Sequence, residues 1–89
     1  MIKCLSIKVS GKVQGVGFRY FALDAARKTG INGYVRNETD GTVFIEAEGT
    51  QEQLDIFISL CRKGPGRSMV TNIVYQSSPV MGHNSFIIR

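Results

Sequence analysis

Cysteine and histidine, the residues of disulfide frameworks and zinc sites, are scarce in this sequence. Cys4 and Cys61 are its two cysteines and His83 is its one histidine. A chain of 89 residues can fold around a single core without covalent cross-links, so we expect both thiols to be free. The lone histidine lacks the partners that structural zinc requires. Because His83 lies in a stretch rich in Ser, Pro, Gly and Asn, we expect it to be solvated.

Long apolar runs are also absent. No segment approaches the roughly 18 to 20 consecutive apolar residues of a membrane-spanning helix, and the first residues resemble a strand more than a cleavable leader. These absences argue against a membrane protein and favour the cytoplasm. One small core is all that this length supports, so residues 1–89 are expected to form a single domain.

Basic residues outnumber acidic ones, with 11 Lys plus Arg against 7 Asp plus Glu and a formal net charge of +4. Such a chain attracts anions, whether nucleic acid, anionic lipid or a phosphorylated small molecule. The net charge does not distinguish among these three kinds of anionic partner, so sequence motifs are needed to identify the ligand.

The pattern of apolar residues predicts a short series of strands and helices. Strands are expected over residues 3–11, 33–37 and 42–48. Helices are expected over residues 18–28 and 51–63, the second preceded by a capping box of Thr50 and Gln53. Further β structure is expected over residues 68–76, a loop over 77–85 and a last edge strand over 86–88.

This β-α-β-β-α-β order is that of an α+β, ferredoxin-like split βαβ fold, with an antiparallel sheet and two helices on one face. The first two strands then run parallel with the third between them, so their C-terminal ends lie at one edge, about 10 Å apart. The loop after the first strand can therefore meet the end of the second. Cys4 falls on the uncovered face and Cys61 on the buried stripe of the second helix, which argues against a disulfide between them.

A glycine-containing segment, residues 11–19 (GKVQGVGFR), joins the first strand to the first helix. Gly15 and Gly17 let backbone N–H groups converge at the positive end of a helix, and Arg19 adds a planar, permanently charged guanidinium. Together they predict an anion site, although such loops are common and such arginines are often only solvated. The segment lacks the Gly-Lys-Ser/Thr ending of a mononucleotide P-loop. Tyr20 stands where a dinucleotide fingerprint needs a third glycine.

Asn37 ends the second predicted strand. Its amide carries both a donor and an acceptor, so it can hold a water molecule and direct a lone pair of that water at an electrophile. A turn residue before residues 38–41 is the common alternative for asparagine. The expected meeting of Asn37 with the glycine-containing loop favours the functional interpretation.

Two segments resemble the signatures of the acylphosphatase family: residues 11–19, and residues 33–37 (GYVRN) followed by 40–43 (DGTV). The similarity continues through residues 47–49 and 63–65 to 86–89. The family usually has Trp at the place of Tyr34 and often has Gly at the place of Ser85. The resemblance implies hydrolysis of small acyl phosphates to carboxylate and inorganic phosphate, without a metal ion or other cofactor.

The resemblance also implies roles for individual residues. Asn37 would position the attacking water. The phosphoryl group would be held by the Arg19 guanidinium and by the backbone amides of Gln14, Gly15, Val16, Gly17, Phe18 and Arg19. Neither Arg19 nor Asn37 titrates near neutrality, so a phosphate oxygen must accept the proton of the water. That mechanism suits an acyl phosphate, whose carboxylate leaves readily, and does not suit a stable phosphomonoester.

Two other functions fit parts of the sequence. RNA-recognition domains share this order of elements, but their aromatic residues lie on a central strand, whereas Phe18 and Phe21 fall on a predicted buried helix stripe. A non-catalytic module of the same family is the second alternative, against which the presence of both Arg19 and Asn37 argues. The polar open face, with Ser6 and Lys8, weakly favours a monomer. We therefore expect a small acyl phosphate as partner, and neither nucleic acid nor membrane.

Overall fold

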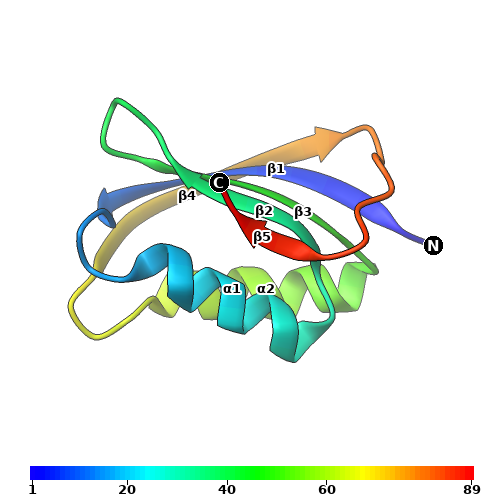
Figure 1. Ribbon diagram of the computed structural model, residues 1–89, viewed down its shortest axis with the longest axis horizontal. Helices are drawn as coiled ribbons and strands as arrows, with labels where there is room; N and C mark the ends of the chain where they lie inside the picture. Colours follow the sequence, from blue (N-terminus) through cyan, green and yellow to red (C-terminus); the bar gives the residue numbers. More distant parts are fainter.

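The apolar stripes of two helices pack against one face of a five-stranded sheet in the computed structural model, which describes residues 1–89 (Figure 1). The elements follow the predicted order. They are β1 (Lys3–Lys12), α1 (Phe18–Thr29), β2 (Asn32–Asn37), β3 (Val43–Gly49), α2 (Gln51–Lys63), β4 (Met69–Ser78) and β5 (Phe86–Ile88). The ferredoxin-like arrangement predicted from the sequence is confirmed. No helix combines the length and the apolar character needed to cross a membrane.

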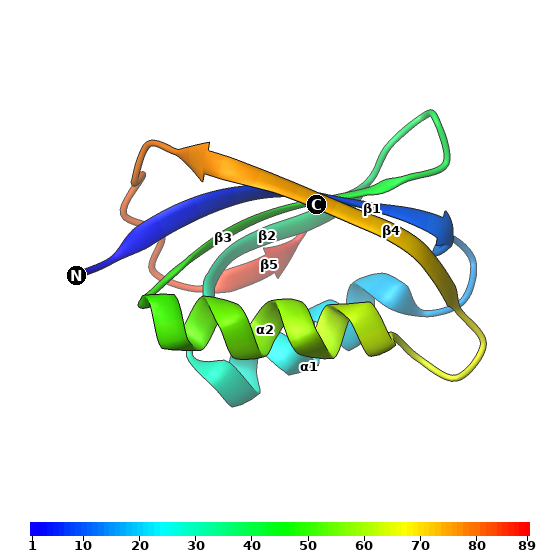
Figure 2. The same ribbon diagram turned by 180° about the vertical axis from the view of Figure 1, so that it is seen from behind.

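The strand order β4-β1-β3-β2-β5 places β1 and β2 in the predicted relation. Both pair antiparallel with β3, so they run parallel to each other and end at the same edge of the sheet. The pairing of β5 with β2 is parallel, so the sheet is mixed and not antiparallel throughout. The reason is that residues 79–85 carry the chain from β4 at one edge to the opposite edge, where β5 starts in the direction of β2 (Figure 2).

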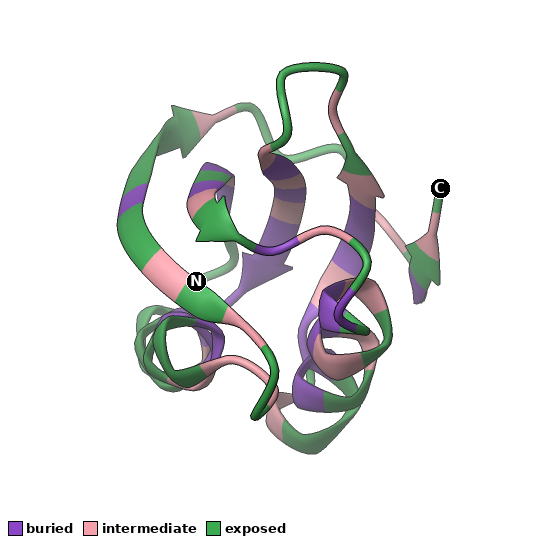
Figure 3. Ribbon diagram, turned by 90° about the vertical axis from the view of Figure 1, so that its left-hand side faces the viewer, coloured by how far each residue is buried: buried purple, intermediate pink, exposed green.

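The core lies between the sheet and the helices, as the alternation of apolar residues predicts. It contains one face of each of the central strands and one stripe of each helix (Figure 3). Its fully buried side chains include Ile7, Val9, Phe18, Val35, Val43, Ile45, Leu54 and Phe57. The predicted capping box is also present, because the Thr50 hydroxyl accepts the N–H of Gln53 and the Gln53 side chain accepts the N–H of Thr50. Apolar burial thus holds α2 against the sheet, and the capping box stabilises its first turn.

Both cysteines are free and lie on opposite faces of the sheet, as predicted. Cys61 belongs to the core under α2, where burial raises the pKa of its thiol to about 12. Cys4 lies on the face without helices and yet is only 2% exposed. Burial is also the main cause that raises the pKa of the Cys4 thiol, although a hydrogen bond from the Ser78 hydroxyl lowers it. Neither thiol is therefore poised as a nucleophile.

The segment between β4 and β5 covers part of the open face, which the sequence does not predict. His83 was expected to be solvated, but its Nε2 lies 2.5 Å from a carboxylate oxygen of Glu46, and its side chain is only 20% exposed. Its ring also meets Tyr34 edge-on, with 5.9 Å between ring centroids. The expectation was wrong because the partners of His83 come from β2 and β3, which are distant along the chain.

Glu48 holds the same segment through its carboxylate, which accepts the backbone N–H groups of Met81, Gly82 and His83. Burial raises the pKa of the Glu48 carboxyl, but these three donors outweigh it and leave the pKa below the ordinary value of 4.5. A carboxyl whose pKa is lowered by folding stabilises the protein at pH values above the ordinary pKa of that carboxyl. That stabilisation is lost as the pH falls through the folded value.

We expect Glu48→Gln to lower the free energy of unfolding at neutral pH by about 1.5–3 kcal/mol, since it removes the charge from a buried carboxylate that accepts three N–H groups. The variant should also lose less stability than the parent when the pH falls below 4.5. Urea unfolding of both proteins from neutral to acid pH measures this difference. If the free energies of unfolding of parent and variant changed equally with pH, the assigned role of the Glu48 carboxylate would be contradicted.

Candidate active site

The loop from β1 to α1, residues 13–17, contains two glycines in the left-handed region of backbone space, with φ +72° at Gly15 and +80° at Gly17. A Cβ atom added at either glycine would have no neighbour within 4 Å, so there is space for a side chain. A residue other than glycine would nevertheless be strained there, because its backbone would need a positive φ. Nine backbone hydrogen bonds lie outside the helices and strands, and none uses an N–H of residues 14–19 as donor. These N–H groups are therefore free to bind an anion.

The side chains of the loop fix its position on the core. Val16 and Phe18 are buried, and Phe18 is only 1% exposed. The added Cβ of Gly64, in the connection from α2 to β4, would lie 3.4 Å from the Phe18 ring. Phe18 therefore cannot stack on a nucleic-acid base, and its backbone is what remains available to a ligand.

Arg19 lies in the first turn of α1 and is half-buried. The four ion pairs of the structure do not include it, and no acidic residue occurs in that turn. Lys12 ends β1, Lys63 ends α2 and Arg67 lies in the connection from α2 to β4. All three are exposed and belong to no ion pair. The ends of β1 and α2 and this connection lie near the β1–α1 loop at the left of Figure 1. The guanidinium of Arg19 and this surrounding charge add to the positive end of the helix and favour an anionic ligand.

Asn37 is exposed at the end of β2, opposite Val43 in the last pair of the β2–β3 ladder. Its side chain makes no hydrogen bond within the protein, so its amide can bind a water molecule or a ligand. The turn after it is closed by backbone hydrogen bonds from Glu38 to Thr42 (2.9 Å) and from Gly41 to Glu38 (3.2 Å). Asp40 reinforces the turn by accepting the N–H and the hydroxyl of Thr42. These hydrogen bonds hold the backbone that follows Asn37 in place.

The loop and the turn are joined by the side chain of Gln14. Its Nε2 donates to the carbonyl oxygens of Glu38, at 2.8 Å, and Thr42, at 2.9 Å. The predicted meeting of the loop with the end of β2 is therefore confirmed, and both lie at the left-hand end of Figure 1. Sequence reasoning assigned only the backbone of Gln14 to the site. It missed the side-chain role, because no local pattern relates residue 14 to residues 38 and 42.

The chain as a whole is similar to acylphosphatases. The sequence model of the Acylphosphatase family matches residues 5–88. The acylphosphatase of Thermotoga maritima is 44% identical over 88 residues, which cover 99% of this chain and 98% of that protein. The chain belongs to the acylphosphatase family. Its structure matches the crystal structure of the Bacillus subtilis acylphosphatase with a TM-score of 0.95 and 41% identity, over 100% of this chain and 99% of that one.

This acylphosphatase is a hydrolase of acid anhydrides that acts on small acyl phosphates. A second solved relative, an acylphosphatase from Coxiella burnetii, has a TM-score of 0.94 and 31% identity, over 99% of this chain and 93% of that one. Tyr34, where the family usually has Trp, packs under Arg89, whose Cζ lies 4.0 Å from the ring centroid. Ser85 accepts the N–H of Gly33 through its carbonyl. Both departures therefore concern the β2–β5 edge and not the loop.

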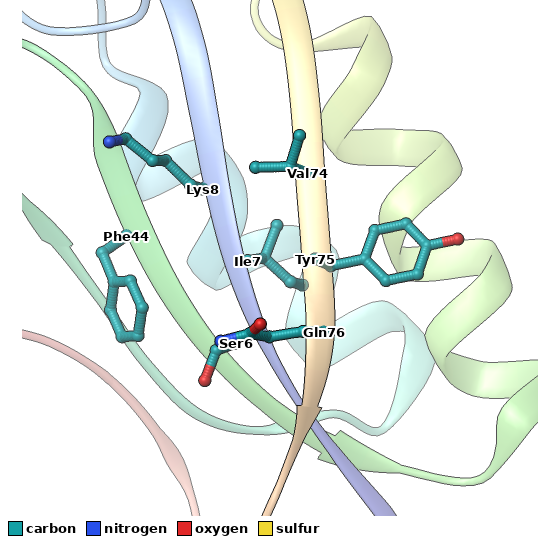
Figure 4. A pocket seen from close by; sticks show the side chains of 7 residues that line it. All are labelled: Ser6, Ile7, Lys8, Phe44, Val74, Tyr75 and Gln76. Carbon is teal, nitrogen blue, oxygen red and sulfur yellow. The ribbon is translucent and has the colours of Figure 1, made fainter.

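Three surface hollows of the acylphosphatase lie outside the loop and do not include Asn37. One, of about 320 Å³, lies on the open sheet face between β1, β3 and β4 (Figure 4). A second, of about 360 Å³, lies beside the β2–β3 turn, and a third, of about 400 Å³, lies by residues 82–84. No group of three or more His, Cys, Asp or Glu side chains is arranged to hold a metal ion. The groups that the structure leaves available beside the loop are its backbone N–H groups, the Arg19 guanidinium and the Asn37 amide.

Proposed function

We propose that this acylphosphatase holds the phosphoryl group of its substrate in the β1–α1 loop and directs at it a water molecule bound by Asn37. The backbone N–H groups of residues 14–19 and the Arg19 guanidinium bind the phosphoryl oxygens. The observation that carries the proposal is the link from Gln14 to Glu38 and Thr42, because it brings free N–H donors and the end of β2 together. The arrangement provides donors for an anion on one side and an amide for water on the other.

In the proposed reaction the water oxygen attacks phosphorus, and the bond from phosphorus to the bridging oxygen breaks. The carboxylate leaves with the bonding electrons, and a phosphate oxygen accepts the proton of the water. Neither Arg19 nor Asn37 changes charge near neutrality, so neither acts as a general base. Catalysis then depends on positioning the water and on stabilising charge on the phosphoryl oxygens.

The same reasoning restricts the substrate class. A carboxylate is a good leaving group and needs little protonation, whereas an alkoxide is a poor one. A site without a general acid therefore suits acyl phosphates, and phosphomonoesters are left with their very slow intrinsic hydrolysis. We accordingly propose that no metal ion or other cofactor takes part.

The test is hydrolysis of benzoyl phosphate in excess EDTA and in ¹⁸O-labelled water, beside an alkyl phosphate as the comparison substrate. We expect turnover that EDTA does not change, label in the inorganic phosphate, no measurable turnover of the alkyl phosphate, and a kcat that is flat across the neutral pH range. Loss of activity in EDTA, label in the benzoate, or efficient turnover of the alkyl phosphate would contradict the mechanism.

We further propose that the enzyme works as a monomer in the cytoplasm, with no nucleic acid or membrane as partner. Two free, buried thiols suit a reducing compartment. The open face carries the polar Ser6 and the ion pair of Lys8 with Asp40, which do not favour a stable apolar interface. Sedimentation of the purified protein across a range of concentrations tests the oligomeric state.

A further inference from the structure

Gln14 makes the only side-chain hydrogen bonds of residues 13–19, and both reach across the chain to the β2–β3 turn. Its amide nitrogen carries two hydrogens, and each has its own carbonyl partner, on Glu38 and Thr42. The two contacts bridge 24 and 28 positions along the sequence. They lie in a partly buried environment, where hydrogen bonds are less exposed to competition from water.

The two acceptors bracket the turn that follows Asn37. Glu38 is its immediate neighbour, and Thr42 precedes Val43, the pairing partner of Asn37 in β3. The carbonyl of Thr42 also accepts the backbone N–H of Glu38, so Gln14 adds a second donor to a hydrogen bond that closes the turn. A displacement of the Gln14 side chain relative to the turn would therefore move the backbone that carries Asn37.

No side-chain hydrogen bond of Asn37 fixes its place relative to the loop. Its side chain is exposed and makes no hydrogen bond within the protein. The distance from the phosphoryl-binding loop to the Asn37 amide is thus set by backbone, and Gln14 is the side chain that joins the two backbones. A misplacement of about 1 Å at a reacting centre can lower a rate by about a hundredfold.

We propose that the Gln14 side chain is a positioning residue, which sets the distance between the phosphoryl-binding loop and the water held by Asn37. The inference rests on the function proposed above and adds to it a side chain that touches neither phosphate nor water. The backbone amide of Gln14 keeps its separate role in the loop. A substitution of the side chain should therefore affect the rate of the chemical step and leave the binding of phosphate in place.

Gln14→Met is the first test, because methionine keeps the length of the side chain and removes both donors. We expect kcat for benzoyl phosphate to fall by about 10- to 100-fold, with the inhibition constant of inorganic phosphate within about threefold of the parent. Gln51→Met is the matched control: Gln51 also donates a side-chain hydrogen bond, to Asp55 at the other end of the molecule, and should keep the parental kcat. Rates are compared at a temperature where circular dichroism shows each variant folded.

A double-mutant cycle with Asn37→Ala separates positioning from a merely structural effect. If Gln14 acts through Asn37, Gln14→Met should change kcat by less than about twofold in the Asn37→Ala background. The inference would be overturned if the two substitutions lowered kcat by factors that multiply in the double variant. It would also be overturned if Gln14→Met kept the parental kcat, or if its phosphate affinity fell as much as its kcat. A parental kcat in Asn37→Ala alone would overturn the proposed function, and the inference with it.

Gln14→Glu provides a second variant with an independent measurement. Near neutrality its carboxylate has no hydrogen to donate and faces two carbonyl oxygens, so kcat should be low. Protonation restores one donor, so kcat of this variant should rise as the pH falls towards the carboxyl pKa, where the parent stays flat. A variant with a low but flat profile would contradict the positioning role.

Discussion

Arg19→Ala is expected to lose both turnover of acyl phosphates and binding of inorganic phosphate. Arg19 provides the one permanent charge of residues 13–19 and lies in the first turn of α1, next to the loop. No carboxylate forms an ion pair with it. Its planar guanidinium can donate two parallel hydrogen bonds to a phosphoryl group. We expect kcat/KM for benzoyl phosphate to fall by at least about 10³-fold, equivalent to about 4 kcal/mol of transition-state stabilisation. Steady-state kinetics and competitive inhibition by phosphate measure the two losses.

Two further variants control for this result. Arg27→Ala removes an exposed arginine from the last turn of the same helix, far from the loop, and should keep parental kinetics. Arg19→Lys keeps the charge without the paired donors, so it should retain part of the phosphate affinity and little of kcat. An Arg19→Ala variant that binds phosphate as the parent does would place the phosphoryl group elsewhere.

Asn37→Ala is expected to show a different pattern, with kcat reduced and phosphate binding retained. The amide is proposed to contact the water and not the phosphoryl group, so its loss removes an interaction made in the transition state. We expect kcat to fall by about 10²- to 10³-fold, or about 3–4 kcal/mol, by analogy with removal of one preorganised donor. The inhibition constant of phosphate should stay within about threefold of the parent.

Asn32→Ala is the matched control for this variant, since Asn32 starts the strand that Asn37 ends and lies at the opposite end of the sheet. It should leave kcat unchanged. Near-full activity in Asn37→Ala would remove the water-positioning role. A parallel loss of phosphate affinity would instead make Asn37 a ligand of the phosphoryl group.

Much of the fold follows from local sequence patterns. The alternation of Leu5, Ile7 and Val9, the capping box at Thr50 and the turn at Asp40 and Gly41 each depend on neighbours within a few residues. The glycines of the loop also encode their conformation locally, because a positive φ is strained for other residues. The split βαβ order then brings the loop to the end of β2, so the sequence alone predicts that Asn37 lies near the loop.

The remaining features depend on distant partners that no local pattern specifies. The pair of Gln14 with Glu38 forms because the sheet places β1 and β2 on either side of β3. The pair of His83 with Glu46 forms because the segment between β4 and β5 reaches β3. The parallel direction of β5 likewise follows from the path of residues 79–85 around the sheet. A glutamine after a strand or a histidine in a polar loop can form hydrogen bonds with many partners. Tertiary packing determines which partner it has in the folded protein.

The antiparallel pairing of β1 with both β3 and β4 has a consequence for how the chain becomes active. It joins Cys4 to Ser78, 74 positions away, and the loop reaches the β2–β3 turn across 24 positions or more. Non-local pairings of this kind cost the entropy of loop closure before their contacts form, which slows folding. The two parts of the candidate site lie on different elements, the β1–α1 loop and the β2–β3 hairpin. Because the loop and the β2–β3 turn meet only when β1 has paired with β3, we expect activity during refolding to appear no earlier than that pairing.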